Sequence, residues 1–229
     1  MKLPFNRGLV VSCQALAGNP LRDTYVLARL AKAAEIGGAV AIRANGVEDI
    51  TEMKKLLTVP IIGINKQKDS TGRTVITPTF ESAREVYEAG AGVIALDMTF
   101  QESDIREDPK ETVRQIHEKL GIPVMADIST VEEAIAACEA GVDLVSTTLA
   151  GYLPGKEYAP HEKYIPNYAL IEEILKNGKV TAPCIGEGRF WTPEALQKGL
   201  SMGLYGVVIG KAITNAMAIT QYFTAELEV

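Results

Sequence analysis

Short runs of β-branched and small apolar residues alternate with longer amphipathic segments along the whole chain. Runs that are apolar throughout are typical of parallel strands covered on both faces. Eight strand–helix units in 229 residues predict an α/β fold, a closed (β/α)8 TIM barrel, with an open doubly wound sheet as the alternative. The expected strands are 8–14, 38–43, 60–66, 92–97, 122–127, 142–147, 180–187 and 205–210.

The segments between these runs are expected to be helices. Asn45, Thr130 and Thr192, the last followed by Pro193, occupy positions that favour helix starts. Three stretches, EAGAGVIAL, EAGVDLVS and SMGLYGVVI, predict a left-handed glycine between a helix and a buried strand. No linker divides the chain, so residues 1–229 are expected to form a single domain. The expected helices lie near 22–36, 47–57, 79–90, 110–120, 130–140, 167–177, 193–202 and 212–225.

Composition limits the classes of partner. A net charge of −6 and a pI near 5.1 argue against nucleic acid, which requires a basic face. No apolar run is long enough to span a membrane, and the apolar run near the N-terminus is shorter than we expect of a secretory signal. Cys13, Cys138 and Cys184 lie far apart without a CxxC pair, which favours a reducing cytoplasm. With only two histidines, no metal-ligand pattern is present.

Polar residues end the expected strands. In (β/α)8 barrels the active site lies at the carboxyl ends of the strands. Seven of the eight expected strands end in a hydrogen-bonding or charged residue, and the eighth ends in Gly210. We interpret this set as an active site rather than as eight unrelated loop residues. Its polar members are Gln14, Arg43, Lys66, Asp97, Asp127, Ser146, Thr147 and Glu187.

Opposite strands of an eight-stranded ring predict how these groups meet. Lys66 ends the third strand and Glu187 the seventh, so they should approach a ligand from opposite sides, as should Gln14 and Asp127. A base on one side and an acid on the other suit the inversion of a carbon centre. Arg43 could hold negative charge that develops on an oxygen between them.

Two glycine-rich loops with basic residues follow the last two strands. Such loops bind phosphate in many barrels of this kind. The first, IGEGRFWTPE, contains Gly186, Gly188 and Arg189, and the second, VIGKAITN, contains Gly210 and Lys211. A single GxG motif is also common in tight turns, but two such loops on adjacent strands favour a phosphate site.

Sequence blocks spread over nearly the whole chain resemble the N-acetylmannosamine-6-phosphate 2-epimerase family. The resemblance implies a (β/α)8 barrel that needs no cofactor and interconverts N-acetylmannosamine 6-phosphate and N-acetylglucosamine 6-phosphate in sialic acid and amino-sugar breakdown. The blocks are VSCQAL (11–16), AIRANGVEDI (41–50), PIIGINK (60–66), VITPT (75–79), IALD (94–97), MADIST (125–130), STTLAGY (146–152), GEGRFWTPE (186–194) and VVIGKAIT (207–214).

The same resemblance assigns residues and a partner. It implies Lys66 as the catalytic acid/base with Glu187 as its partner carboxylate. It implies contacts to the phosphorylated N-acyl amino sugar from Gln14, Arg43 and Asp127, to which we add Thr147. It also suggests a homodimer, for which the apolar C-terminal segment AMAITQYFTAELEV is a candidate contact, although this segment could equally pack on its own barrel.

Two departures from the family leave the exact sugar open. Asn215 stands where the family has an arginine that helps to hold phosphate, and Lys211 could supply the missing charge. The stretch 97–103 lacks the basic residues and the proline that the family has there. Two other functions therefore remain: a Schiff-base lyase or aldolase acting on a phosphorylated sugar acid, which would also use a buried lysine, and a non-catalytic sugar-phosphate binding protein.

Overall fold

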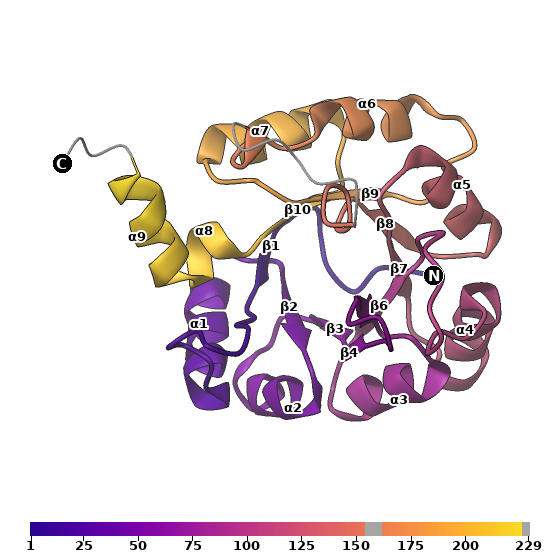
Figure 1. Cartoon of the computed structure of the whole chain (residues 1–229), viewed down its shortest axis with the longest axis horizontal. Coiled ribbons are helices and arrows are strands. Elements are labelled where there is room, and N and C mark those ends of the chain that lie inside the picture. Colours follow the sequence, from indigo (N-terminus) through magenta and orange to yellow (C-terminus); the bar gives the residue numbers. More distant parts are fainter. Residues whose placement is uncertain (154–161, 226–229) are drawn as a thin grey trace.

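Eight parallel strands close into a barrel in the computed structural model, which describes residues 1–153 and 162–225. The order around the ring is β1, β2, β3, β6, β7, β8, β9 and β10, with β10 paired to β1 (Figure 1). The predicted (β/α)8 fold is therefore confirmed. The strands are β1 Gly8–Ser12, β2 Ala41–Asn45, β3 Ile61–Ile64, β6 Val93–Asp97, β7 Val124–Asp127, β8 Leu144–Ser146, β9 Cys184–Glu187 and β10 Gly206–Ile209.

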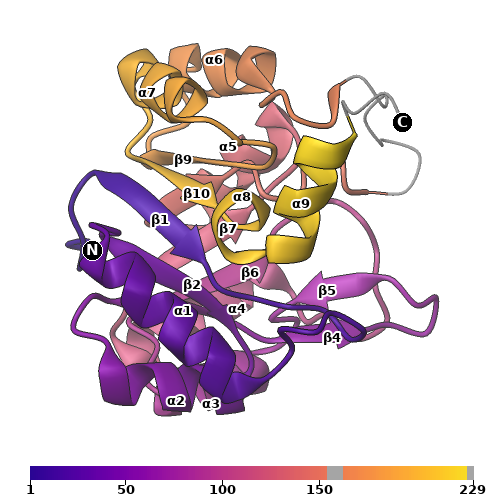
Figure 2. The same cartoon turned by 90° about the vertical axis from the view of Figure 1, so that its left-hand side faces the viewer.

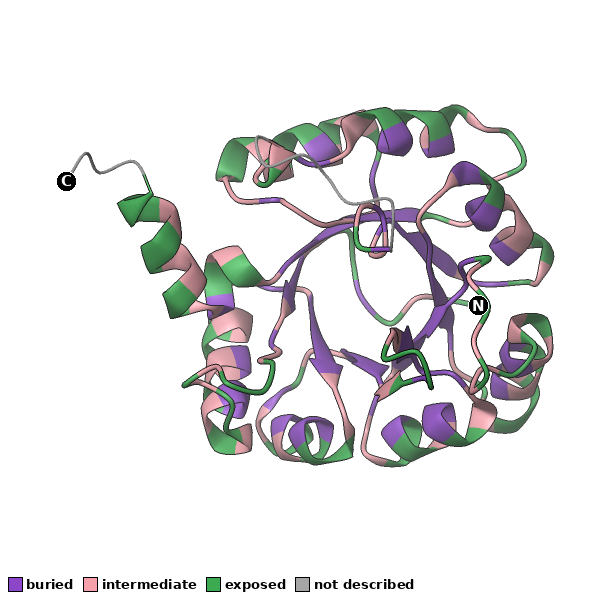
Figure 3. Cartoon of the chain, in the orientation of Figure 1, coloured by how far each residue is buried: buried purple, intermediate pink, exposed green. Residues whose placement is uncertain are grey.

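Helices surround this ring, with buried residues toward the strands and exposed residues toward solvent (Figures 1 and 3). Thr130 and Thr192 cap α5 and α7 through their side chains, as predicted. The expected left-handed glycines are also present at Gly90, Gly141 and Gly203. The helices are α1 Thr24–Ile36, α2 Val47–Leu56, α3 Phe80–Glu88, α4 Pro109–Gln115, the π-helix η1 Ile116–Leu120, α5 Val131–Glu139, α6 Tyr168–Lys176, α7 Pro193–Met202, α8 Lys211–Thr214 and α9 Ala216–Thr224.

The expected strand 60–66 ends early, because the chain leaves the barrel before Lys66. The backbone of Asn65 bonds to Thr77, through a Thr77 N–H to Asn65 O bond of 2.8 Å and an Asn65 N–H to Thr77 Oγ1 bond of 3.0 Å. Lys66 then begins an antiparallel hairpin that the sequence analysis did not predict, formed by β4 Lys66–Lys68 and β5 Thr74–Ile76. The hairpin lies at the same end of the barrel as α8 and α9 (Figure 2).

Two further expectations are wrong. Asn45 does not cap α2; its Oδ1 accepts the Lys66 N–H at 2.9 Å, so it orients the hairpin instead. The single helix expected over 212–225 is divided at Asn215, whose side chain caps α9 by accepting from the Ala218 N–H at 3.0 Å. Within the described residues, no helix is long and apolar enough to cross a membrane.

Alternation along the strands separates two apolar layers. Side chains at every second position form an inner cluster, and the intervening ones pack against the helices. Two residues beyond the inner cluster, the same face of the strands becomes polar, as at Arg43, Asp127 and Glu187. The inner cluster therefore places these side chains on one polar layer at the carboxyl ends of the strands. It includes Val10, Ala41, Ile62, Ile64, Val93, Ala95, Met125, Leu144, Ile185 and Val208.

Candidate active site

A buried arginine joins three strands at the centre of this polar layer. Arg43, from β2, is 1% exposed and forms a bidentate pair with Asp127 of β7, with Nη1–Oδ1 at 3.0 Å and Nη2–Oδ2 at 2.5 Å. Arg43 Nη1 also donates to Glu187 Oε2 of β9 at 2.7 Å. Asp127 has no exposed surface, and its carboxylate accepts from Arg43 and from the Thr148 hydroxyl. The predicted residues Arg43, Asp127 and Glu187 thus form a single charged cluster.

The predicted base lies beside this cluster. Lys66 Nζ donates to Gln14 Oε1 at 2.7 Å, and Gln14 Nε2 donates to Ser12 Oγ at 2.8 Å. Lys66 is also close enough to Glu187 for each charge to alter the pKa of the other group. The strand assignment for Lys66 was wrong, yet its amine still bonds Gln14 and lies within the electrostatic influence of Glu187 at the carboxyl end of the barrel.

The surroundings move both groups toward their neutral forms. Burial lowers the pKa of the Lys66 amine, and the positive charge of Arg43 lowers it further, against the opposite effects of Glu187 and Asp127. Burial raises the pKa of the Glu187 carboxyl, although Arg43 opposes this. A neutral amine accepts a proton and a neutral carboxyl donates one, so both pKa shifts favour acid–base chemistry.

The two threonines after β8 have different partners. Thr147 uses its hydroxyl to bond the backbone of Glu187, accepting from its N–H and donating to its carbonyl, both at 2.9 Å. Thr148, which the sequence analysis did not select, contacts the side chains of Asp127, Glu187 and Arg43. Period-two alternation could have identified it, because Leu144, in the inner cluster, has the same parity as Thr148.

The first predicted phosphate loop contains one glycine that packing requires. A Cβ at Gly186 would lie 2.6 Å from Leu204 Cδ1 and 3.0 Å from Phe190 Cζ, so the glycine permits close packing against these side chains. Gly188 and Arg189 follow in the left-handed region, with φ of +104° and +63°. Arg189 Nη1 donates to the carbonyl of Glu162 at 3.1 Å.

The second predicted phosphate loop joins β10 to α8. A Cβ at Gly210 would lie 3.3 Å from Ser12 Cβ, next to the end of β1. Lys211 is exposed and begins α8, and Asn215 acts as the cap of α9. Phosphate binding by these residues stays a prediction.

A second ionic cluster fixes the hairpin that carries Lys66. The Asp97 side chain, at the end of β6, has no exposed surface and pairs with Arg73 at 2.9 Å and Arg106 at 3.2 Å. Its Oδ1 also accepts from the Thr99 hydroxyl at 2.7 Å. Because Arg73 comes from the hairpin and Arg106 from the loop after β6, Asp97 ties both segments to the barrel.

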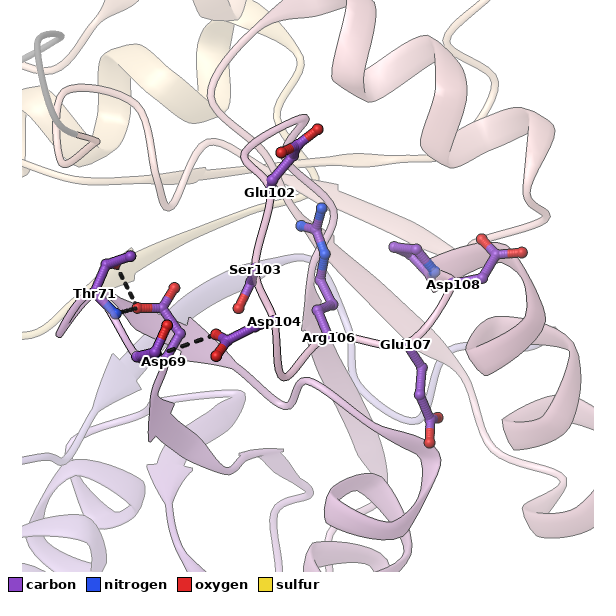
Figure 4. A pocket seen from close by; sticks show the side chains of 10 residues that line it. Asp69, Thr71, Glu102, Ser103, Asp104, Arg106, Glu107 and Asp108 are labelled. Atoms are coloured by element: carbon purple, nitrogen blue, oxygen red, sulfur yellow. Dashed lines mark hydrogen bonds between the residues drawn. The ribbon is translucent and has the colours of Figure 1, made fainter.

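A surface hollow of about 600 Å³ lies between the hairpin turn and that loop, and Lys66 is not among its lining residues (Figure 4). Ser70 N–H donates to Asp104 Oδ1 across it at 3.2 Å. Its charged lining is mainly acidic, and Arg106 is its basic member. The lining residues are Asp69, Ser70, Thr71, Glu102, Ser103, Asp104, Arg106, Glu107, Asp108 and Pro109.

Replacing Arg73 with methionine is expected to lower kcat about tenfold, because a loosened hairpin misplaces the Lys66 amine. The free energy of unfolding should fall by about 2 kcal/mol, since Asp97 keeps Arg106 but loses a buried charge partner. Urea unfolding and steady-state kinetics measure both effects. As a control, Arg84→Met removes an exposed arginine that pairs with Glu81 and Glu88 on α3, and should change neither. Equal kcat values for the two variants would contradict the anchoring role.

Among residues 1–153 and 162–225, no group of three or more His, Cys, Asp or Glu side chains is arranged to hold a metal ion. The thiols of Cys13 and Cys184 are buried, and burial raises their pKa to about 12. These two cysteines are therefore poor nucleophiles.

Comparison with known proteins identifies the family. Residues 27–229 match the family model described as "Putative N-acetylmannosamine-6-phosphate epimerase". A relative from Caldanaerobacter subterraneus subsp. tengcongensis, described as "Putative N-acetylmannosamine-6-phosphate 2-epimerase", is 50% identical over 94% of this chain and 89% of its own length. Another, from Clostridioides difficile, is 44% identical over 96% of both chains.

A solved structure gives the same result. The N-acetylmannosamine-6-phosphate 2-epimerase from Clostridium perfringens superposes with a TM-score of 0.88 at 44% identity, covering 96% of this chain and 93% of that one. The family model, the relatives and this structure agree, and the chain belongs to the N-acetylmannosamine-6-phosphate epimerase family.

Proposed function

We propose that the protein interconverts N-acetylmannosamine 6-phosphate and N-acetylglucosamine 6-phosphate by removing the proton at C2 and returning one from the opposite face. The main support is the placement of Lys66 and Glu187 at the same end of the barrel, where burial lowers the pKa of the amine and raises the pKa of the carboxyl. The family membership supplies the substrate class.

Lys66 acts as the base in this proposal. The C2 proton lies next to the aldehyde of the opened sugar, which makes it acidic. Neutral Nζ takes this proton, the C2–H electron pair moves into a C1–C2 double bond, and negative charge develops on the aldehyde oxygen. Gln14, which bonds the amine at 2.7 Å, holds it in position. Arg43 supplies positive charge near the developing oxyanion.

Glu187 acts as the acid. Its neutral carboxyl donates a proton to C2 from the other face, which inverts the centre, and solvent then restores both groups. The backbone of Glu187 is fixed by the Thr147 hydroxyl, and its side chain by Arg43. In this arrangement Asp127 acts on the sugar indirectly, because its carboxylate holds the Arg43 guanidinium.

Turnover in deuterated water tests the reaction. Incubation with N-acetylmannosamine 6-phosphate should give the epimer with deuterium at C2, while the remaining substrate stays largely protonated at early times. Absence of the epimer would refute the proposed activity. A Schiff-base lyase would instead be trapped covalently when borohydride is added with substrate, whereas the epimerase should show no adduct.

Phosphate recognition is assigned to the loops after β9 and β10, with Lys211 as the charge that compensates for Asn215. Lys211→Ala is expected to raise the KM for the phosphorylated substrate about tenfold with little change in kcat, because the phosphate is bound equally before and during the reaction. Kinetics with the phosphorylated and unphosphorylated sugars measure this. A parallel fall in kcat would count against the assignment. Lys198→Ala, on the exposed side of α7, serves as the control.

The homodimer remains part of the proposal, with α9 as the contact. This helix has no buried residue and exposes Met217 and Phe223, while Tyr222 stacks on Trp191 at 5.1 Å between ring centroids. Residues 226–229 of the predicted contact segment lie outside the described residues. Sedimentation should give the mass of two chains, and Phe223→Lys should shift it toward one.

A further inference from the structure

The hydroxyl of Thr148 lies among more acceptors than it has hydrogens. Its Oγ1 is 2.6 Å from Asp127 Oδ1 and 3.0 Å from Glu187 Oε2. Ser146 Oγ lies at 2.8 Å and Arg43 Nη1 at 3.2 Å. A threonine hydroxyl has one hydrogen to donate and two lone pairs. If both carboxyl groups were ionised, Thr148 could donate to only one of them, and the other contact would join two oxygens without a hydrogen between them.

Arg43 does not remove this shortage. Its Nη1 has two hydrogens, and Asp127 Oδ1 and Glu187 Oε2 accept from it at 3.0 and 2.7 Å, shorter than its contact with Thr148. The Ser146 hydroxyl can donate to Thr148, but this supplies no hydrogen to a carboxylate. One additional proton on the carboxyl pair completes the set, so that every short oxygen–oxygen contact contains a hydrogen.

We propose that Thr148 links Asp127 and Glu187 into one proton-sharing pair, which enters the reaction carrying a single acid proton. This inference rests on the proposed function, because it names the source of the proton that Glu187 delivers. Thr148 is a positioning residue in this scheme, since it acts through the two carboxyl groups rather than on the substrate.

The transfer within the pair is balanced. A proton on Asp127 Oδ1 passes to Thr148 Oγ1 while the Thr148 hydroxyl proton passes to Glu187 Oε2. One O–H bond forms and one breaks at the hydroxyl, so Thr148 ends unchanged. The net result is movement of one proton from Asp127 to Glu187, and the reverse path is equivalent. A single remaining negative charge on the pair matches the single positive charge of buried Arg43.

Electrostatics agrees with the shared proton. Two carboxylates in one buried site disfavour double ionisation, and a proton bridged between them lowers that cost. The raised pKa of Glu187 has burial as its largest cause and the charge of Asp127 as a contributor, with Arg43 opposing. Burial and the charge of Arg43 lower the pKa of the Lys66 amine, which favours its neutral form beside this cluster.

Carboxyl NMR of the ligand-free protein tests the inference without relying on activity. With the aspartate and glutamate carboxyl carbons labelled with ¹³C, the Asp127 and Glu187 signals should change together as the pair takes up one proton. Thr148→Val removes the hydroxyl but keeps the shape, and should make the two signals titrate separately. Thr148→Ala provides a second variant that lacks the hydroxyl, should the valine fail to fold. Independent titration in the wild type would overturn the proposal.

Kinetics test its catalytic consequence. Sharing stabilises the singly protonated pair, so Thr148→Val should lower kcat about tenfold and move the alkaline limb of its pH profile down by about one pH unit. Thr148→Ser keeps a hydroxyl and should restore the wild-type limb. A lower kcat with an unmoved limb would indicate a purely structural role and would overturn the inference, as would a serine variant that behaves like valine.

Failure of the inference can be told apart from failure of the proposed function. If the wild type does not epimerise N-acetylmannosamine 6-phosphate, the proposed function fails, while the carboxyl titration still decides whether the proton is shared. If the wild type epimerises and the carboxyl signals titrate independently, only the inference about Thr148 fails.

Discussion

Replacing Lys66 with methionine is expected to reduce kcat about 10³-fold or more, because no other described side chain is placed to remove the C2 proton opposite Glu187. Methionine keeps much of the length and apolar volume of the lysine stem, so the hairpin should stay in place. The free energy of unfolding should not fall, since removing a largely buried amine also removes its desolvation cost. Substrate turnover and urea unfolding measure the two quantities.

Two further variants test whether Lys66 is needed as a base, rather than for its positive charge or as a lysine on the hairpin. Lys66→Arg keeps a positive charge but cannot lose its proton near neutral pH, so it should be as inactive as Lys66→Met. Lys68→Met removes a lysine from the same hairpin strand, where Nζ bonds only the Gly72 carbonyl among the described residues, and should keep full activity. Activity of Lys66→Met above about a tenth of the wild type would exclude Lys66 as the base.

The pH profile of the wild type follows from the same amine. The base acts in its neutral form, and burial with the Arg43 charge lowers the pKa of Lys66 below the usual lysine value. Activity should therefore be lost as the pH falls through that lowered pKa, and be retained above it until the acid on the other side loses its proton. This acid limb should vanish from the residual activity of Lys66→Met.

Replacing Arg43 with methionine should cost both activity and stability. Arg43 is the main group that opposes the burial of the Glu187 carboxyl and forms two bonds with Asp127. Breaking such a buried pair from one side costs about 3–5 kcal/mol, because the remaining charges have no partner. We also expect kcat to fall about 10²–10³-fold, since the oxyanion loses its nearest positive charge. Denaturant unfolding and turnover are the measurements.

The stability loss should grow with pH. Without Arg43, the largest influence that opposes burial is lost, and the folded-state pKa of Glu187 rises further above its unfolded value. A carboxyl whose pKa is higher in the folded state than in the unfolded state contributes to the stability of the fold at pH values below its unfolded-state pKa. That contribution is lost as the pH rises through its folded-state pKa. The difference in the free energy of unfolding between wild type and Arg43→Met should therefore be larger at pH 8 than at pH 5. A gap that does not change with pH would argue against burial of unpaired carboxyls as the cause.

A double variant isolates the ion pair. Arg43→Met with Asp127→Leu replaces both charges by apolar side chains and should recover much of the lost stability, because a buried ion pair contributes little more than well-packed apolar groups. Activity should not return, since the charge near the oxyanion is still missing. Recovery of activity would show that Arg43 serves the fold rather than the reaction.

The amino-acid sequence by itself determined the barrel and the ring of polar strand ends. Eight apolar runs of strand length, separated by amphipathic segments and left-handed glycines such as Gly90 and Gly141, leave few arrangements other than a closed parallel barrel. The positions of Arg43, Asp127 and Glu187 follow directly, because a strand end is a local property of the sequence and the end of the barrel is common to all strands.

Only the tertiary structure decided how these groups are paired. The hairpin that carries Lys66 depends on bonds from Asn65 to Thr77 and on the Asp97–Arg73 pair, contacts between residues far apart in the chain. Asparagine is a residue type that favours helix caps, yet the side chain of Asn45 accepts from the backbone N–H of Lys66 in the next strand–helix unit instead. The position of Thr148 in the site depends on the alternation of side chains along its strand and on its contacts with two carboxyl groups from other strands. Local propensity predicts strands and caps, whereas a proton shared between two strands requires three-dimensional proximity, which the folded barrel alone provides.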